Sequence, residues 1–265
     1  MQGVAPIHYI SINGDTHQQI DADVVEESLA CISLNGSEVA TFMCSPHELD
    51  KLAIGFLYNE GFINSLEDIH HLRVSKQETC VDIWLKDTSI SVPERHITTA
   101  GCGGGVTFDD LSQEHDPLDI DLHVSARDLA ALMRQMHLGA KLYQRSRGIH
   151  TAALADTKQL LLQVEDIGRH NCLDKLRGAA LVDNIKTHGR ILLSSGRISS
   201  EMLNKARRLE TPIICSRTSP TSLSVALAKA WNITIVAYLR QDRMRIYAHP
   251  NRLFNTGSVQ VTAEP

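Results

Sequence analysis

The pattern of apolar and polar residues in the first 86 positions predicts strands and one helix. Residues 27–44 contain two β-rich runs, LACISL and SEVATFMCS, on either side of Asn35-Gly36, a pair that is typical of a tight hairpin turn. The next segment, PHELDKLAIGFLYNEG, has its apolar residues at helical spacing, with Ser45 as the expected N-cap and Gly61 as the stop. We therefore expect an α+β fold for this region. Two further strands are expected near 69–75 and 79–86.

From residue 125 onward, helices and strands alternate. A helix is predicted from Ser125 to about Arg145, TAALAD and QLLLQVED predict a hairpin, and HNCLDKLRGAALVDN predicts a second helix. The remaining runs alternate between strand and helix as RILLSS, SEMLNKARRL, PIICS, SLSVALAKAW, ITIVAYL and the final strand MRIYAH. This order predicts an α/β sandwich with a largely parallel sheet, in which ligands bind at the carboxyl ends of the strands.

In the stretch between these regions, about 87–123, the apolar residues have neither helical nor strand spacing. It contains the glycine-rich run HITTAGCGGGVTF, followed by six acidic residues in 109–121 without a Lys or Arg. Such a composition is typical of a solvated connection. We therefore predict two parts: a smaller α+β region over 1–118 and an α/β domain over 119–265.

The composition excludes several broad classes of protein. The 265 residues are 43% hydrophobic and 22% charged, with a formal net charge of −5 and a mean hydropathy of −0.13. This acidic balance argues against a protein that coats nucleic acid, while a locally basic pocket remains compatible with it. No window approaches 18 uninterrupted apolar residues, and the N-terminal sequence lacks the layout of a signal peptide. We expect a globular, cytoplasmic protein without a membrane span.

The six cysteines are spread along the chain, and no two of them form a CxxC motif. In a long chain with few cysteines we expect reduced thiols and no zinc. Five of them lie in apolar runs predicted as strand or helix. Cys102 differs, because its GCGGG context offers free backbone N–H groups that could lower a thiol pKa. The alternative is an incidental cysteine in a flexible loop. The six are Cys31, Cys44, Cys80, Cys102, Cys172 and Cys215.

Three strand–helix junctions carry polar residues that could bind an anion. SSGRISSEM places Arg197 beside a helix N-terminus, and SRTSPTSL repeats this layout; the alternative is an ordinary capped helix, with Ser199 as N-cap and an exposed arginine. EDIGRHNCLDK suits a nucleotide phosphate or a guanine edge, or else is a solvated junction capped by Asn171 or Asp174. A lone histidine, His150, is expected to be structural. Neither GxxxxGK[ST] nor GxGxxG occurs.

Several of these segments together resemble the FdhD family, the formate dehydrogenase accessory sulfurtransferases. The matching stretches cover most of residues 27–252 in the family's order, and VEDIGRHNCLDK and SSGRISSEM are the most specific. The others are SLNGSEVATFMCSPHELDKLAIGFLYNEGFI, the GCGGG loop, RGIHTAAL, SPTSLSVALA and RMRIYAHPNRL.

The resemblance implies a sulfur carrier. The family takes sulfur from a cysteine desulfurase as a persulfide and passes it to the bis-guanine-dinucleotide molybdenum (or tungsten) cofactor, which is then installed in formate dehydrogenase. The resemblance also implies a cytidine-deaminase-like second domain, a homodimer, and a guanine-nucleotide end of the cofactor bound near the dimer. Expected partners are therefore a desulfurase, formate dehydrogenase and molybdenum bis(molybdopterin guanine dinucleotide) as a bound substrate.

Carried over onto this sequence, the resemblance makes Cys102 the sulfur-carrying residue. Many family members have a CxxC at this point, whereas here the second cysteine becomes Gly105, or Thr99 stands in place of the first. One thiol remains in either alignment, so no disulfide within the loop can help to release the sulfur. The cofactor-binding residues that the resemblance implies are Met244, Arg245, Ile246, Tyr247, Ala248, His249, Arg169, His170, Ser195, Gly196 and Arg197.

Two other functions compete with sulfur transfer. A zinc deaminase would need H-x-E and P-C-x-x-C, but Ala152 stands where the Glu would follow His150, and no PCxxC occurs. A chaperone that binds the molybdenum cofactor without carrying sulfur is the stronger alternative, because the second loop cysteine is missing. In either cofactor-binding case a basic cluster would suit the phosphates of a dinucleotide. It consists of Arg240, Arg243, Arg245 and Arg252.

Overall fold

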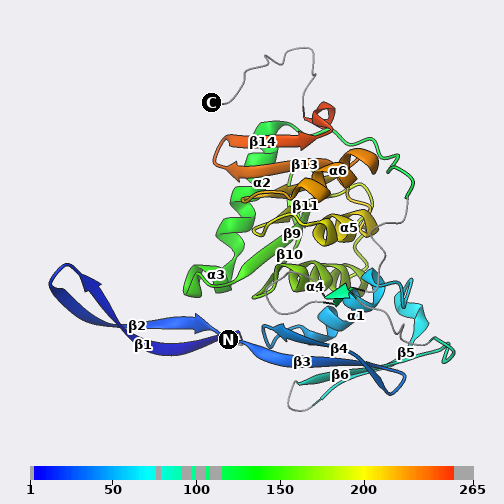
Figure 1. Ribbon diagram of the computed structural model, residues 1–265, viewed down its shortest axis with the longest axis horizontal. Helices are drawn as coiled ribbons and strands as arrows, with labels where there is room; N and C mark the ends of the chain where they lie inside the picture. The colour runs from blue at the N-terminus through cyan, green and yellow to red at the C-terminus, as the bar shows by residue number, and fades with distance from the viewer. Residues whose placement is uncertain (1–2, 76–78, 91–96, 99–105, 108–114, 254–265) are drawn as a thin grey trace.

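The structure of the protein is a computed structural model. It consists of a two-stranded arm, a small α+β part and a larger α/β part (Figure 1). The residues that the structure describes are 3–75, 79–90, 97–98, 106–107 and 115–253. Among these residues, no helix is both long and apolar enough to cross a membrane.

The small part is a four-stranded sheet with one helix packed on one of its faces. Its strands run in the order β4-β3-β6-β5, and the buried side of α1 supplies much of its core. The hairpin between β3 and β4 is confirmed, because Asn35 and Gly36 both have positive φ, as the tight turn requires. The elements are β3 (Ser28–Leu34), β4 (Ser37–Cys44), α1 (Leu49–Asn59), the 3₁₀ turn η1 (Leu66–Asp68), β5 (Ile69–Val74) and β6 (Cys80–Leu85).

The start of α1 differs from the prediction, whereas its end agrees. Glu48, at φ 53°, occupies the N-cap position, because Ser45 is buried: its N–H donates to Asp166 and its Oγ accepts from the N–H of Ile167. Ser45 therefore joins the two parts of the chain and caps no helix. Gly61, at φ +80°, follows the helix in the left-handed conformation that ends many helices.

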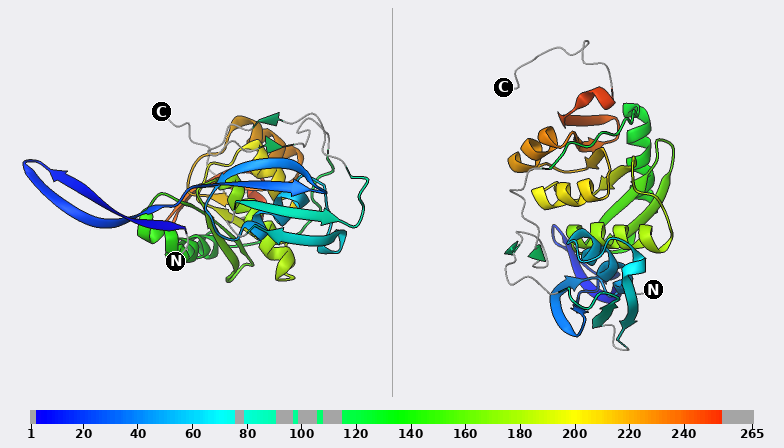
Figure 2. Two further views of the ribbon diagram at one scale, coloured as in Figure 1. Left: turned by 90° about the horizontal axis from the view of Figure 1, so that it is seen from below. Right: turned by 90° about the vertical axis from the view of Figure 1, so that its right-hand side faces the viewer.

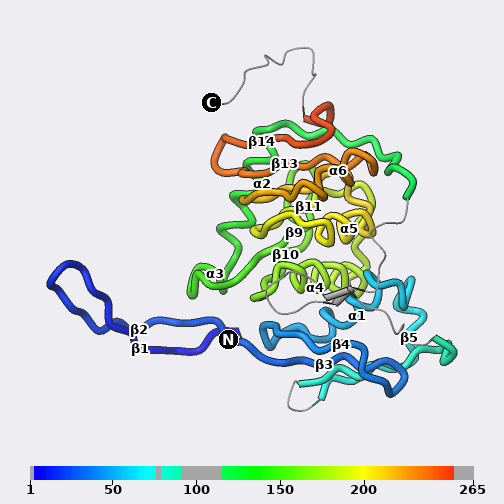
Figure 3. Tube along the Cα trace, in the orientation of Figure 1, coloured from blue at the N-terminus to red at the C-terminus, as the bar shows by residue number. Residues whose placement is uncertain are grey.

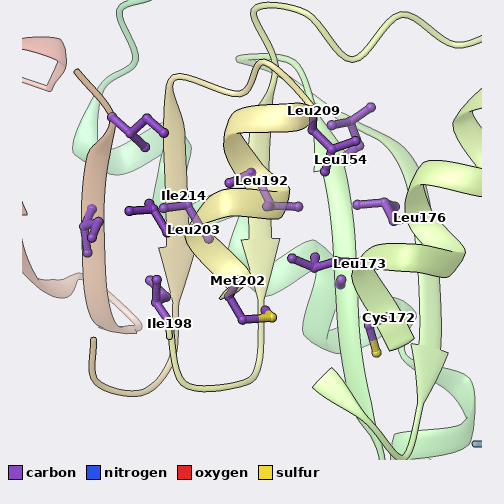
Figure 4. Close-up of a cluster of buried hydrophobic side chains, with 14 of the residues drawn as sticks. Leu154, Cys172, Leu173, Leu176, Leu192, Ile198, Met202, Leu203, Leu209 and Ile214 are labelled. Carbon is purple, nitrogen blue, oxygen red and sulfur yellow. The ribbon is translucent and has the colours of Figure 1, made fainter. Parts of the chain in front are cut away.

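The larger part is a six-stranded sheet between two layers of helices. The helices α4, α5 and α6 cover one face, where Leu173 of α4, Leu203 of α5 and Ile214 belong to one core (Figure 4). The apolar side of α2 covers the other face. The elements are α2 (Ala126–Gly139), α3 (Lys141–Ser146), β9 (His150–Ala155), β10 (Leu160–Asp166), α4 (Arg169–Val182), β11 (Ile191–Ser194), α5 (Ser200–Arg208), β12 (Ile213–Ser216), α6 (Ser222–Ala230), β13 (Thr234–Arg240), β14 (Arg243–Ala248) and η2 (Pro250–Arg252).

The expected alternation of strands and helices is confirmed, but the largely parallel sheet is wrong. The strand order is β10-β9-β11-β12-β13-β14, and only the β11–β12 and β12–β13 pairs are parallel. Short turns join β9 to β10 and β13 to β14, and a short turn imposes an antiparallel pair. The fold class is as predicted: the larger part is α/β, and the chain taken together is α+β.

The single helix predicted over Ser125–Arg145 is two helices. Its continuity breaks at Ala140, whose ψ of 84° lies outside the helical range. The carboxylate of Glu165 accepts hydrogen bonds from the N–H groups of Leu142 and Tyr143, which are free donors at the start of α3. A carboxylate on β10 thus fixes the break, and the local sequence contains no sign of it.

Two further features of the structure were not predicted. Residues 4–25 form a long antiparallel hairpin, β1 (Val4–Asn13) and β2 (Thr16–Val25), which projects from the body (Figure 3). Cys31 and Cys80 form a disulfide between neighbouring positions of the parallel strands β3 and β6, which contradicts the expectation of reduced thiols for this pair. Forty-nine residues separate the two cysteines, so only the strand pairing brings them together.

The small and large parts meet along the helices α1 and α4, which lie side by side (Figure 1). Two glycines permit this close approach. A Cβ on Gly55 would overlap with the backbone carbonyl of Asp174, and a Cβ on Gly178 would overlap with that of Lys51. Backbone cannot move aside as a flexible side chain can, so neither position accepts a larger residue. The division at residue 118 stays a prediction.

We predict that Gly178→Ala lowers the free energy of unfolding by about 2–3 kcal/mol, because the added methyl group forces the two helices apart. Urea denaturation monitored by circular dichroism measures this loss. Gly148→Ala is the matched control: its Cβ would meet no atom closer than 3.5 Å, so the change should stay within about 0.5 kcal/mol. Equal stability of the two variants would contradict the helix contact.

Candidate functional site

The carboxyl ends of the parallel strands β11, β12 and β13 border two adjoining pockets. The larger has a volume of about 1030 Å³ and the smaller about 520 Å³. Arg217, directly after β12, and Arg240, at the end of β13, line both pockets. We call the two pockets together the arginine cleft. It lies where the topology of the sheet predicts a ligand site.

The described lining of the arginine cleft contains six arginines and no Asp or Glu. These side chains come from four different segments, so that a surface of one charge forms only in the folded chain. Arginine offers planar pairs of N–H donors that match phosphate and carboxylate groups. The cleft therefore has the chemistry of an anion site. The six are Arg134, Arg147, Arg217, Arg240, Arg243 and Arg245.

Arg217 is held in place by a histidine of α2. Its Nη1 lies 2.8 Å from Nδ1 of His137, which also lines the larger pocket. Burial, Arg217 and Arg147 all lower the pKa of His137, so the imidazole is neutral and accepts a hydrogen bond from the guanidinium. The carbonyl of His137 accepts a further bond from Gln144. This chain of contacts fixes Arg217 at the border between the pockets.

Tyr238 gives the larger pocket an aromatic surface. It lies at an irregularity of the β13–β14 pairing with φ at 52°, a conformation that tyrosine rarely adopts, and its N–H donates to the carbonyl of Thr218. The guanidinium carbon of Arg245 lies 4.8 Å from the centroid of its ring. Backbone strain of this kind is often found at ligand sites, and an arginine stacked on tyrosine forms a flat platform for a base.

Ser195 and His150 line the smaller pocket together. Ser195 Oγ accepts from the N–H of Thr151 and lies 3.1 Å from Nδ1 of His150. Burial lowers the pKa of His150, and Arg169 lowers it further, so the ring is neutral near pH 7. His150 is thus the satisfied, structural histidine that was expected, although its ring also faces the pocket.

The implied stretch 244–249 is divided between the cleft and the interior. Met244 and Arg245 line the larger pocket, and their role in binding a cofactor stays a prediction. The next three residues pack against the two cores of the domain, and the ring of His249 is bonded to the carbonyl of Lys229. The three that pack inside are Ile246, Tyr247 and Ala248.

One of the four arginines of the basic cluster expected near the C-terminus does not line the arginine cleft. Arg240, Arg243 and Arg245 line the cleft, but Arg252 is buried and donates hydrogen bonds to Thr234 Oγ1 and to the carbonyl of Ile120. Arg252 therefore stabilises the interior, because it lies in η2, beyond the end of β14 that is remote from the cleft.

The segment EDIGRHNCLDK is largely buried, so it is not a solvated junction, and of its residues Ile167 lines the smaller pocket. Asp166 and Lys175 are fully buried and form an ion pair of 2.7 Å. Asp174 pairs with Lys205 of α5 and accepts from Asn59 of α1. Asn171 donates to Asp166 and to the carbonyl of Met43.

Gly168 occupies the N-cap of α4, so the predicted capping by Asn171 or Asp174 is wrong. The reason is that both side chains point into contacts between the parts of the chain. The motif therefore ties α4 to α1, β4 and α5.

The remaining implied residues are arranged around the same motif. Arg169 is buried against Gly196, where a Cβ would lie 2.8 Å from the Cβ of the arginine. The ring of His170 lies 2.9 Å from Glu201 and 3.2 Å from Ser199 Oγ, and burial lowers its pKa. These three residues pack α4 against α5 and form no part of the described cleft lining.

The starts of α5 and α6, which the sequence offered as possible anion sites, have ordinary N-caps. Ser199 Oγ accepts from the N–H of Met202, and Thr221 forms a capping box with Ser224. Arg197 is exposed and does not line either pocket. SSGRISSEM thus has the capped helix and the exposed arginine of the alternative interpretation, whereas Arg217 and Thr218 of SRTSPTSL line the arginine cleft.

The described cysteines are poor nucleophiles. Cys31 and Cys80 are bonded to each other. Burial, followed by the nearby Asp166, raises the pKa of Cys44 to about 12, and the same two causes raise the pKa of Cys172. Burial raises the pKa of Cys215 as well. Cys102, together with Thr99 and Gly105, lies outside the described residues.

The sequence did not single out several residues of the cleft. Arg217 was indicated only as part of SRTSPTSL, the junction that follows the predicted strand PIICS at the carboxyl end where ligands bind. The others carry no local signal, since helices and a strand irregularity bring them to the cleft. They are Arg134, His137, Arg147 and Tyr238.

Comparisons with known proteins agree with the resemblance. The model of the FdhD/NarQ family matches residues 24–254. Sulfur carrier protein FdhD of Bacillus subtilis (strain 168) is 33% identical over 241 residues, which cover 89% of this chain and 92% of the relative. The protein of the same name from Bacillus pumilus (strain SAFR-032) is 35% identical over 237 residues, 87% of this chain and 90% of the relative.

A solved structure has the same fold. It is the crystal structure described as a formate dehydrogenase accessory protein from Desulfotalea psychrophila, with a TM-score of 0.79 and 27% identity. The match covers 95% of this chain and all of the other. The architecture of both parts is therefore shared with a protein of this kind.

We predict that His150→Gln makes stability less dependent on pH. Burial lowers the pKa of His150 in the folded state, so the unfolded chain, with a pKa near 6.5, binds the proton more tightly. Stability is complete above that pH and falls as the pH drops below it, by up to about 1.4 kcal/mol per pH unit for one histidine. Urea titrations at several pH values between about 7.5 and 5.5 should show a shallower slope for the variant. An unchanged slope would contradict a neutral buried ring.

Proposed function

Since the chain belongs to the FdhD/NarQ family, we propose that it is a sulfur carrier for formate dehydrogenase. In this proposal Cys102 takes sulfur from a cysteine desulfurase as a persulfide, and the arginine cleft holds the guanine-dinucleotide molybdenum cofactor that receives it. The cofactor is a substrate of the protein. The observation that carries the proposal is the cleft itself, an arginine-lined site in a protein of net charge −5.

The arginine cleft suits a dinucleotide in both charge and size. A bis-dinucleotide carries several phosphates, and arginines from separate segments can each bind one at a fixed distance from the next. The larger pocket, at about 1030 Å³, lies at the upper end of the range for ligand sites, and the smaller pocket continues it. The two pockets can therefore take a long, branched anion rather than a single phosphate.

The platform of Tyr238 and Arg245 supports a nucleobase in the larger pocket. A flat base can stack on this pair while the neighbouring arginines contact its phosphates. The N7 and O6 acceptors of guanine match the paired donors of arginine, whereas adenine offers a donor at the corresponding edge. The lining thus favours guanine over adenine.

The state of the other cysteines supports Cys102 as the sulfur carrier. A persulfide forms when a thiolate attacks the outer sulfur of the donor persulfide; the donor S–S bond breaks, and the desulfurase cysteine leaves as a thiolate. Attack requires an accessible thiolate. Burial raises the pKa of Cys44, Cys172 and Cys215, and the remaining pair is a disulfide. Cys102, within four glycines, is left as the candidate.

A cofactor chaperone without sulfur transfer is the second candidate. It is favoured by one feature of the sequence, the single cysteine in a loop where many relatives carry two. Both candidates use the arginine cleft in the same way, and they differ only in whether Cys102 acquires sulfur.

We predict that GDP raises the melting temperature of the protein more than ADP does, because a ligand that binds only the native state stabilises it by mass action. Arg217→Gln should weaken GDP binding about tenfold or more, since it removes a charged hydrogen-bond donor from the border of the pockets. Differential scanning fluorimetry and titration calorimetry measure the two effects. Arg73→Gln, on the exposed side of β5, is the control and should bind GDP like the wild type. Equal shifts with both nucleotides would count against a guanine site.

We predict that Cys102→Ser abolishes persulfide formation and formate dehydrogenase maturation. The protein should gain the mass of one sulfur atom after incubation with a cysteine desulfurase and cysteine, and peptide fragmentation should place that sulfur on Cys102. Cys215→Ala, which removes a buried thiol, should retain the adduct and lose stability instead. A Cys102→Ser protein that still matures the dehydrogenase would leave the chaperone function as the explanation.

A further inference from the structure

The Cys31–Cys80 disulfide lies in the small part of the molecule, and neither cysteine belongs to the described lining of the arginine cleft. It joins β3 and β6, the two central strands of the four-stranded sheet. The two cysteines are 49 positions apart, so the bond closes a loop that contains β4, α1 and β5. Such a bond is either a permanent crosslink or a pair that opens and closes, and its surroundings decide which.

The disulfide lies on the face of the small sheet that α1 does not cover. Side chains alternate between the two faces of a strand, and Ala30 and Ile32 belong to the core under α1, so Cys31 faces the other way. Val81 of the same core places Cys80 on that side as well. Figure 2 (left) shows the sheet from this side, with its strands in front and no described helix over them. We call this side the open face of the small sheet.

Solvent reaches the disulfide on the open face. Both cysteines are half-buried, and Leu29, on the same face of β3, is 58% exposed. Thr41, which lies opposite Cys31 on β4, is exposed as well. Exchange of a disulfide requires that a thiolate reaches one of its sulfur atoms, and this surface permits such an approach. The free cysteines that the structure describes are at most 1% exposed, and they are Cys44, Cys172 and Cys215.

The strand pairing holds the two cysteines together whether or not they are bonded. Cys31 and Cys80 form the first pair of the parallel β3–β6 ladder, and three further pairs follow, up to Leu34–Ile83. The N–H of Cys31 also donates to the carbonyl of Thr79 at 2.8 Å. These contacts belong to the backbone and do not need the S–S bond. An opened disulfide therefore leaves two thiols at neighbouring positions, from which the bond can form again.

We propose that Cys31 and Cys80 form a thiol–disulfide exchange site that opens and closes in the folded protein. A thiolate of a small dithiol attacks one sulfur atom, the S–S bond breaks, and the other cysteine leaves as a thiolate that takes up a proton. The second thiol of the reagent then displaces the first cysteine from the mixed disulfide. Two electrons and two protons thus pass to the pair, and the dithiol becomes a disulfide. Glutathione disulfide, as the oxidant, closes the pair by the reverse exchange.

The state of the pair sets the stability of the small part. The loop that the bond closes contains α1, whose crossing with α4 joins the two parts of the chain. A disulfide stabilises a protein mainly by restricting the unfolded chain, and a long loop increases the effect. Opening the bond should therefore ease unfolding without changing the folded arrangement. The site depends neither on Cys102 nor on the ligand of the cleft, so this proposal and the proposed function can fail separately.

The first test counts the reactive thiols of the native wild-type protein after equilibration with glutathione disulfide. Treatment with dithiothreitol in the absence of urea, followed by iodoacetamide, should place carbamidomethyl groups on Cys31 and Cys80, as peptide mass mapping shows. Returning the reduced protein to glutathione disulfide before alkylation should protect both. The three buried cysteines are internal controls and should stay unlabelled. A pair that opens only in urea, or that does not close again, would overturn the proposal.

A second test measures the melting temperature with and without the dithiol. The dithiol should lower that of the wild type by about 5–10 °C, because the unfolded chain is released from its closed loop. The double variant Cys31→Ser with Cys80→Ser should melt at the lower temperature in both conditions, and circular dichroism should show that it is folded. Cys102→Ser is the matched control and should respond like the wild type. A wild-type melting temperature that the dithiol leaves unchanged would contradict the exchange site.

Discussion

The close crossing of α1 and α4 is the constraint on which the rest of the structure depends. It brings the backbones at Gly55 and Gly178 so near to the opposite helix that no side chain fits. Helices at this distance bring their polar side chains within reach of one another, so that Asn59 of α1 donates to Asp174 of α4. The position of the small sheet relative to the large one follows from this contact, because α1 carries the first sheet and α4 packs on the second.

The crossing also explains why the most specific motifs of the family surround buried charges. Lys175 has no exposed surface, and it is tolerable there only because Asp166 and the carbonyl of Ser45 share its charge. Removing the side chain of either Asp166 or Lys175 would leave the other one charged and unpaired in the interior, which costs several kcal/mol of stability. The segment EDIGRHNCLDK is therefore fixed by the interior of the fold, while the residues that face the ligand are arginines supplied by other segments.

Local signals predicted most of the elements but not their arrangement. Asn35-Gly36, Gly61 and the helical spacing of α1 act within a few residues, and each prediction made from them is confirmed. The break at Ala140 depends on Glu165, the disulfide on a strand pairing, and the cleft on arginines from separate segments. Such features arise from contacts between distant residues, and a pattern along the chain carries no trace of them. Asn13-Gly14, at the tip of the β1–β2 arm, is a local signal for a hairpin from which no prediction was made.

Charge is distributed unevenly between the arginine cleft and the N-terminal part of the chain. Six arginines around one cleft repel each other, and the described lining has no carboxylate to offset them, so the empty cleft is held together by the folding of the surrounding elements. In the proposed function, the negative charges of the bound cofactor would offset that repulsion. The first 50 residues contain eight of the 31 Asp and Glu residues and no Lys or Arg, so this part of the chain is acidic. Since the described lining of the cleft contains no Asp or Glu, the positive charge of its arginines is not neutralised there.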